Sequence, residues 1–303
     1  MDGNNKISYS GVNWLLFFNI ILYVVITELV IVVNSYISYN EPDTYLTRII
    51  VQTLGILLPV ILYSKSKGLD FAEFYRVKPL SIKNCAVIIG LGVCWQFIGY
   101  ILKFASTSLF GLFKVTYTVN AQKTPLSTAP HELIPALLAL VVLPAVAEEL
   151  LFRGLVVRSY EKWGTKSAIV ISAVFFSILH LDIINVVATL LMGILLAYVV
   201  VKTDSILSGI LLHFANNLTA TIIMLIISNT KNFRAETIIF ISAGAIVLFF
   251  FLLSKFGRMN IKSKYIPQKK TVAADLCKAL FNLPMLLSII AFIILQLRIF
   301  DVF

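Results

Sequence analysis

Long runs of apolar residues recur along this chain, and they constrain its fold more than any other feature. A helix needs about 20 mostly apolar residues to cross the hydrocarbon layer of a membrane, and eight or nine segments approach this length. Hydrophobic residues make up 59% of the 303 residues and charged residues only 13%, whereas about a quarter of the residues in a soluble domain are charged. The pattern predicts an all-α, polytopic integral membrane protein surrounded by the lipid bilayer.

Short connections join most of the predicted spans, and a longer polar connection with Pro125 and Pro130 separates the third span from the fourth. We find no internal repeat, so residues 1–303 are predicted to form a single membrane domain with a motif-bearing core at about residues 133–228. The fifth and sixth spans are short, and we expect one of them to be tilted or to cross incompletely. The segments are approximately Val12–Val33, Arg48–Tyr63, Ile82–Lys103, Leu133–Tyr160, Lys166–His180, Ile183–Val201, Ser205–Ile227, Thr237–Leu253 and Leu283–Ile299.

The net charge of +10 would raise the question of nucleic-acid binding in a soluble protein. Here the Lys and Arg residues lie in short connections between apolar segments, notably Lys65–Lys83 and Lys255–Lys270. No basic patch is combined with aromatic residues on a polar domain, so nucleic acid is not expected as a partner. Because basic loops of membrane proteins remain in the cytoplasm, the N-terminus and these loops are predicted to be cytoplasmic.

A few ionisable residues interrupt the apolar segments, where such residues are costly and by default mark a functional site. Glu148 and Glu149 are adjacent in the fourth span, and two of the three histidines, His180 and His213, have apolar surroundings. At a rise of 1.5 Å per residue from the basic end, these residues and Asn217 lie at similar depths of roughly 14–21 Å. We therefore expect one shared site that opens toward the cytoplasm.

Spacing along the fourth span separates the two glutamates. Glu149 and Arg153 are four residues apart, share a helix face and can form an ion pair. Glu148 points about 100° away from Glu149 and is left for other partners. A carboxylate held away from water can act as a general base, and a neighbouring imidazole such as His180 can share the proton transfer.

His213 and Asn217 are also four residues apart, so they project together and can donate hydrogen bonds to a developing oxyanion. Each residue taken alone has an ordinary structural explanation. A buried histidine is usually a satisfied structural residue, a buried ion pair mostly avoids leaving one charge alone, and asparagines join helices by hydrogen bonds. The shared depth favours the functional interpretation.

Three motifs occur in a fixed order: Glu148-Glu149-…-Arg153, Phe176-…-His180 and His213-…-Asn217. The stretch from about Leu143 to Leu218 resembles the CPBP family of intramembrane proteases, which includes type II CAAX prenyl endopeptidases and bacterial Abi-type proteins. The resemblance implies hydrolysis of a peptide bond by a glutamate-type mechanism. In that scheme, Glu148 and His180 activate water, His213 and Asn217 stabilise the oxyanion, and Glu149 with Arg153 supports the site.

Several alternatives remain open at this point. The resemblance favours a site without a cofactor, although Glu148, His180 and His213 would also form a plausible zinc site with an open water position. The substrate is expected to be a prenylated CAAX protein or a membrane-associated peptide precursor. Other possible functions are a non-enzymatic immunity or scaffold protein and a proton-coupled transporter, but the chain shows no repeated half of the kind found in transporters.

Overall fold

The computed structural model describes residues 7–37, 44–112, 130–230, 235–261, 266–268 and 270–299, and every regular element in these ranges is a helix. Seven of these helices are long and apolar enough to cross a membrane, and an eighth span results if a bent pair near residue 281 is counted as one. The prediction of an all-α, polytopic membrane protein is confirmed for this part of the chain.

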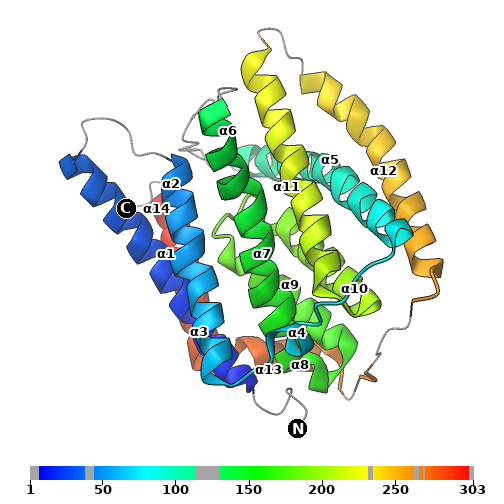
Figure 1. Cartoon of the computed structure of the whole chain (residues 1–303). Coiled ribbons are helices and arrows are strands. Elements are labelled where there is room, and N and C mark those ends of the chain that lie inside the picture. Colours follow the sequence, from blue (N-terminus) through cyan, green and yellow to red (C-terminus); the bar gives the residue numbers. More distant parts are fainter. Residues whose placement is uncertain are drawn as a thin grey trace.

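The helices form a bundle in which the helix that carries Glu148, Glu149 and Arg153 lies between two flanking groups (Figure 1). One group is α1 (Tyr9–Ile37), α2 (Thr44–Ile50), η2 (Val51–Leu57) and α3 (Leu58–Ser66). The short α4 (Phe71–Phe74) leads into the other group, which is α5 (Ile82–Leu112), α10 (Val186–Thr203), α11 (Ile206–Asn229) and α12 (Ala235–Arg258). The bent pair, α13 (Val272–Leu280) and α14 (Leu283–Ile299), makes an angle of 78°, and α14 packs against α1.

Two membrane helices contain a wide turn directly before a proline. η2 precedes Pro59 in α3, and η3 (Leu138–Val142) precedes Pro144 in α7 (Leu143–Glu149). Proline has no N–H to donate to the carbonyl four residues back. Turns with i→i+5 hydrogen bonds pair backbone groups that an ordinary helical turn would leave unpaired. These turns keep both helices continuous, with Gln52 in η2 and Glu148 one turn after Pro144.

The fourth predicted span is a continuous helix that runs from α6 through the centre of the bundle. Every residue of its η4 segment is buried, and a Cβ on Gly154 would lie 2.2 Å from the ring of Tyr75, so glycine is required for this packing. Near its end, Glu161 accepts from Arg76 (2.6 Å) and Arg158 (3.1 Å), which anchors the basic end of the bundle. The segments are α6 (Pro130–Leu137), η3, α7, η4 (Leu150–Val156), α8 (Val157–Tyr160) and η5 (Glu161–Trp163).

The predicted span Lys166–His180 is too short to cross a membrane. The corresponding α9 (Thr165–Leu179) has 15 residues, or about 22 Å of helix, against about 30 Å of hydrocarbon. It turns back into α10 inside the bundle. A Cβ on Gly193 of α10 would lie 2.8 Å from the Cα of Ala173, so the two helices pack closely through small residues, as membrane helices commonly do. By length, α9 is the incompletely crossing member of the two short spans.

The turn between α9 and α10 brings non-helical backbone into the bundle, and a side chain from α14 satisfies it. Gln296 donates from Nε2 to the Leu181 carbonyl (2.7 Å) and accepts at Oε1 from the Ile183 N–H (3.0 Å). Irregular backbone is tolerated at membrane depth only where the protein supplies hydrogen-bond partners. α14 therefore holds in place the turn that carries His180.

Candidate active site

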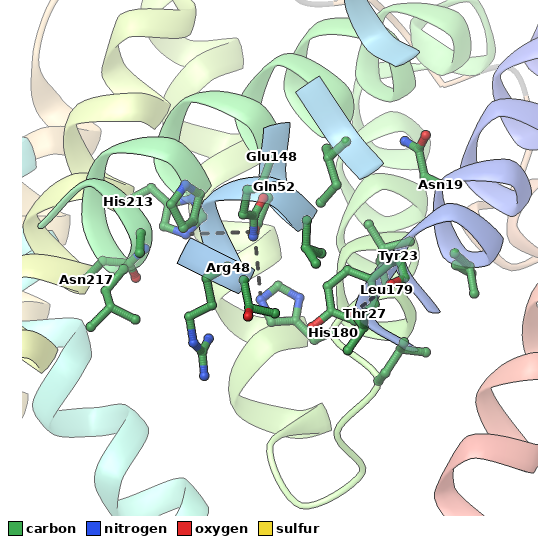
Figure 2. Close-up of a pocket in the computed structure, with 18 residues that line it drawn as sticks. Asn19, Tyr23, Thr27, Arg48, Gln52, Glu148, Leu179, His180, His213 and Asn217 are labelled. Atoms are coloured by element: carbon green, nitrogen blue, oxygen red, sulfur yellow. Dashed lines mark hydrogen bonds and ion pairs between the residues drawn. The ribbon is translucent and has the colours of Figure 1, made fainter. Parts of the chain in front are cut away.

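Three helices place four of the predicted site residues around one cavity. Glu148 comes from α7, His180 follows the last turn of α9, and His213 and Asn217 lie on α11. All four line a cavity of about 370 Å³, and Figure 2 shows them around it together with Gln52 of η2. The convergence expected from their similar depth is therefore present in the structure, while their chemical roles stay predictions.

The two carboxylate oxygens of Glu148 have different surroundings. Oε1 accepts a hydrogen bond from Nε2 of Gln52 (3.2 Å). Oε2 lies 3.8 Å from Nε2 of His180 and 4.0 Å from Nε2 of His213, and within the described ranges this buried oxygen has no hydrogen-bond partner. These separations exceed a direct hydrogen bond and match the span of one bridging water or substrate atom. Glu148 is thus held at one oxygen and available at the other.

The Phe176–His180 spacing has a local explanation. Nδ1 of His180 lies 2.7 Å from the carbonyl oxygen of Phe176, and because a carbonyl only accepts, Nδ1 carries the proton. The ring of Phe176 also packs on the imidazole at a centroid distance of 4.3 Å. Both contacts join residues one helical turn apart, and together they direct Nε2 of His180 toward Glu148.

Glu149 and Arg153 form the predicted ion pair, and both side chains are fully buried. Oε1 of Glu149 accepts from Nη1 of Arg153 (2.8 Å) and from Nδ1 of His213 (3.1 Å). Nη2 of Arg153 donates to the Gly193 carbonyl (3.1 Å), and its guanidinium lies 4.5 Å from the ring centroid of Phe176. The pair therefore fixes the tautomer and orientation of His213, as carboxylates do for functional histidines elsewhere.

Asn217 also has a fixed orientation. Its Oδ1 accepts a hydrogen bond from Nδ2 of Asn216 (3.1 Å), so the two hydrogens on its own Nδ2 remain for a ligand in the cavity. This is the arrangement that an oxyanion donor requires, since the acceptor end of the amide is turned to the protein.

The first two spans contribute polar residues to the cavity that were not predicted from the sequence. Asn19, Tyr23 and Thr27 of α1 line the cavity, as do Arg48 of α2 and Gln52 of η2. The signal was present, because Asn19, Tyr23 and Thr27 repeat every four residues, and Arg48 and Gln52 are also four apart, which places each set on one helix face.

The positions of the histidine and carboxylate side chains can be compared with the zinc site that was considered as an alternative. In the ranges that the structure describes, no three His, Cys, Asp or Glu side chains form a group that could hold a metal ion. Glu148, His180 and His213 are close to one another, and Nδ1 of each histidine is engaged with a protein acceptor while Nε2 faces the cavity. Metal-bound histidines are commonly held in the same way.

A comparison with family models gives one match. The model described as type II CAAX prenyl endopeptidase Rce1-like matches residues 130–219. This core of the chain is similar to the Rce1-like family, which supports the predicted resemblance to CAAX-type proteases. The matched range runs from α6 through most of α11 and contains all the predicted site residues, whereas Gln52 and Arg48 lie outside it. No curated protein and no solved structure matched the chain. The Rce1-like assignment supports an intramembrane endopeptidase of the CAAX type that acts on a membrane-associated protein.

The buried ion pair predicts that the loss of Arg153 destabilises the protein more than a change at Glu148. Arg153→Met leaves the fully buried Glu149 without its guanidinium partner, and breaking a buried pair in this way costs about 3–5 kcal/mol. Glu148→Gln removes no ion-pair partner closer than 3.8 Å. We expect Arg153→Met to unfold at a clearly lower temperature than the wild-type protein in detergent, and Glu148→Gln to unfold near the wild-type temperature.

The control for this comparison is Arg258→Met, which removes an exposed arginine at the end of α12. Equal melting temperatures for Arg153→Met and Arg258→Met would contradict a supporting role for the buried pair.

Proposed function

We propose that this Rce1-like protein is a glutamate-type intramembrane endopeptidase in which Glu148 and His180 activate a water molecule. The observation that carries the proposal is the position of the buried Oε2 of Glu148. It has no hydrogen-bond partner in the part of the chain that the structure describes, and it faces the Nε2 atoms of two imidazoles at 3.8 and 4.0 Å. When His180 is neutral, its Nε2 is an acceptor because Nδ1 holds the proton. Two facing acceptors need a donor between them, and a water molecule supplies two O–H groups.

The chemistry follows from this placement. The water gives a proton to Glu148 as its oxygen attacks the carbonyl carbon of the scissile peptide bond. The resulting tetrahedral oxyanion accepts hydrogen bonds from Nδ2 of Asn217 and from His213. Collapse of the intermediate breaks the C–N bond, and the proton held by Glu148 passes to the departing amine. His180, beside Glu148, assists the two proton transfers.

In this scheme, His213 donates to the oxyanion only when its Nε2 carries a proton. Its Nδ1–H donates to Glu149, so donation from Nε2 to an oxyanion requires both ring nitrogens to be protonated. Asn217 carries no such requirement and donates in either state.

The proposal is tested by cleavage in liposomes of two reporters, a prenylated C-a-a-X peptide and a membrane-embedded peptide precursor. We expect Glu148→Gln and His180→Ala to reduce kcat about 10²–10⁴-fold, the usual contribution of general acid–base catalysis. Asn217→Ala should reduce it about 10²–10³-fold, as loss of one oxyanion donor does. Glu28→Gln, which alters an exposed glutamate of α1 that does not line the cavity, should leave cleavage unchanged.

The same cleavage assay with a chelator tests for a zinc site, and we expect cleavage to continue in the presence of the chelator. Loss of cleavage with the chelator and recovery with zinc would replace the proposed water activation by a metal site. If the wild-type protein and Glu148→Gln were equally inactive on both reporters, a non-enzymatic immunity or scaffold role would take precedence.

The direction in which the cavity extends indicates from which face of the membrane the substrate enters. From Glu148, its lining residues extend to Thr27 in the second half of α1 and to Thr47 and Arg48 in α2. They extend away from the end of α3 that carries Lys65 (Figure 1). Depth alone predicted an opening toward the basic, cytoplasmic side. The lining residues extend the other way, and we propose access from the face opposite the basic loops.

Labelling with a membrane-impermeant maleimide tests the side of access in a variant from which the three native cysteines have been removed. We expect Thr27→Cys to be labelled on intact cells and Ser66→Cys, at the basic end of α3, to be labelled only after permeabilisation. The reverse pattern would restore a cytoplasmic opening, and it would favour a prenylated protein over a secreted peptide precursor as substrate.

A further inference from the structure

Asn19 of α1 is a buried amide at the cavity that contains Glu148. Its exposed fraction is 0%, and neither Nδ2 nor Oδ1 has a hydrogen-bond partner among the residues that the structure describes. Asn19 lines the cavity together with Glu148 and Asn217, and Figure 2 shows the two asparagines on opposite sides of the glutamate. A buried amide with both ends unpaired is costly, so its place at the cavity calls for a ligand.

A second asparagine on the same helix shows what a structural role requires. Asn13 of α1 is as deeply buried as Asn19, but it donates from Nδ2 to Asn282 (3.2 Å) and accepts at Oδ1 from the hydroxyl of Tyr160 (2.9 Å). Such bonds are the ordinary use of asparagine between membrane helices. Asn19 forms no comparable bond within the described ranges, so this explanation does not extend to it.

The helix that packs against α1 contributes a further unpaired acceptor. Gln52 of η2 donates from Nε2 to Glu148, whereas its buried Oε1 has no partner in the described part of the chain. α1 and η2 approach closely, since a Cβ on Gly55 would lie 3.6 Å from the backbone of Tyr23. The wall that these two helices form therefore offers one amide that can donate and accept, and one additional acceptor.

The chemistry of these atoms indicates the kind of ligand. Ordered water commonly satisfies buried polar atoms, and a ligand that replaces the water must supply both a donor and an acceptor. In an extended peptide, the N–H and the C=O of one residue point to the same side, as they do when paired strands exchange two hydrogen bonds. A carboxamide carries the matching acceptor and donors, and the broad side-chain torsion of asparagine lets it align with both.

We propose that Asn19 binds the peptide backbone of the substrate in an extended conformation, an inference that rests on the proposed peptidase function. Oδ1 of Asn19 accepts from the N–H of one substrate residue, and Nδ2 donates to the C=O of the same residue. Backbone contacts give affinity whatever the side chains are, so Asn19 positions the chain without selecting a sequence. Because Asn19 and Asn217 lie on opposite sides of Glu148 (Figure 2), a chain bound at both crosses the carboxylate.

The test uses copies of a cleaved reporter peptide in which one backbone amide near the scissile bond is replaced by an ester, which removes an N–H with little change in shape. We expect the ester at one position to lower kcat/KM of the wild-type protein about 10-fold, mainly through KM, as loss of one hydrogen bond does. Asn19→Leu, which has a similar volume and no polar atoms, should lower kcat/KM for the unmodified peptide about as much and should be insensitive to that ester.

Two further variants complete the comparison. Asn19→Ala cannot crowd the cavity, and we expect it to lose the ester effect as Asn19→Leu does. Asn84→Leu changes a half-buried asparagine of α5 that does not line the cavity, and it should retain the whole ester effect. Binding of the same peptides to Glu148→Gln gives a second measurement that does not depend on cleavage, and the ester at the same position should weaken this binding only while Asn19 is present.

The outcomes separate the inference from the proposed function. Ester effects that are the same in the wild-type protein and in Asn19→Leu would overturn the inference and leave the peptidase intact. An equal loss on every peptide in Asn19→Leu would also overturn it, since Asn19 would then serve packing or water binding alone. If the wild-type protein cleaved no reporter but the ester effect on binding still required Asn19, the peptidase would fail and the backbone-binding site would stand.

Discussion

The buried contact between Glu149 and Arg153 is the interaction on which the rest of the site depends. It joins three helices, because Arg153 donates to the Gly193 carbonyl of α10 and Glu149 accepts from His213 of α11. Two glycines make room for it. Gly193 lets α10 pack against α9, and a Cβ on Gly209 would lie 2.5 Å from Oε2 of Glu149. Since a charge at membrane depth must be paired, this contact leaves His213 one orientation, with Nε2 toward Glu148.

Two adjacent glutamates thus serve different purposes through helix geometry alone. A turn of about 100° directs Glu149 toward Arg153 and His213, which both contact its Oε1. Glu148 points toward the cavity, where Gln52 binds its Oε1, and its Oε2 lies near His180 and His213 without a hydrogen-bond partner among the described residues. Native structures rarely leave buried polar atoms unsatisfied except where function uses them. Oε2 of Glu149 is also buried without a hydrogen-bond partner among the described residues, but it packs against Gly209. Glu148 lines the cavity, and this difference is the physical basis for proposing that Glu148 carries the chemistry.

Much of this arrangement could be predicted from the sequence, and the remainder depends on neighbours in space. Hydrophobic runs located the spans, with α14 at its predicted bounds, and ionisable residues within them located Glu148, His180 and His213. Gln52 was missed because amides commonly join membrane helices without further function. Arg48 was missed because it opens a predicted span, where a basic residue is ordinary. The proposed side of access rests on how α1 and α2 pack, which no local pattern encodes.

The central claim is that Glu148 and His180 act on one water molecule as a unit. The most direct test is a double-mutant comparison of kcat for Glu148→Gln, His180→Ala and the combined variant on one cleaved reporter peptide. Groups that act together in a single step are strongly non-additive. The account predicts that the combined variant is no slower than about the slower single variant. Losses that multiply, so that each substitution has its full effect in the absence of the other residue, would contradict a shared role.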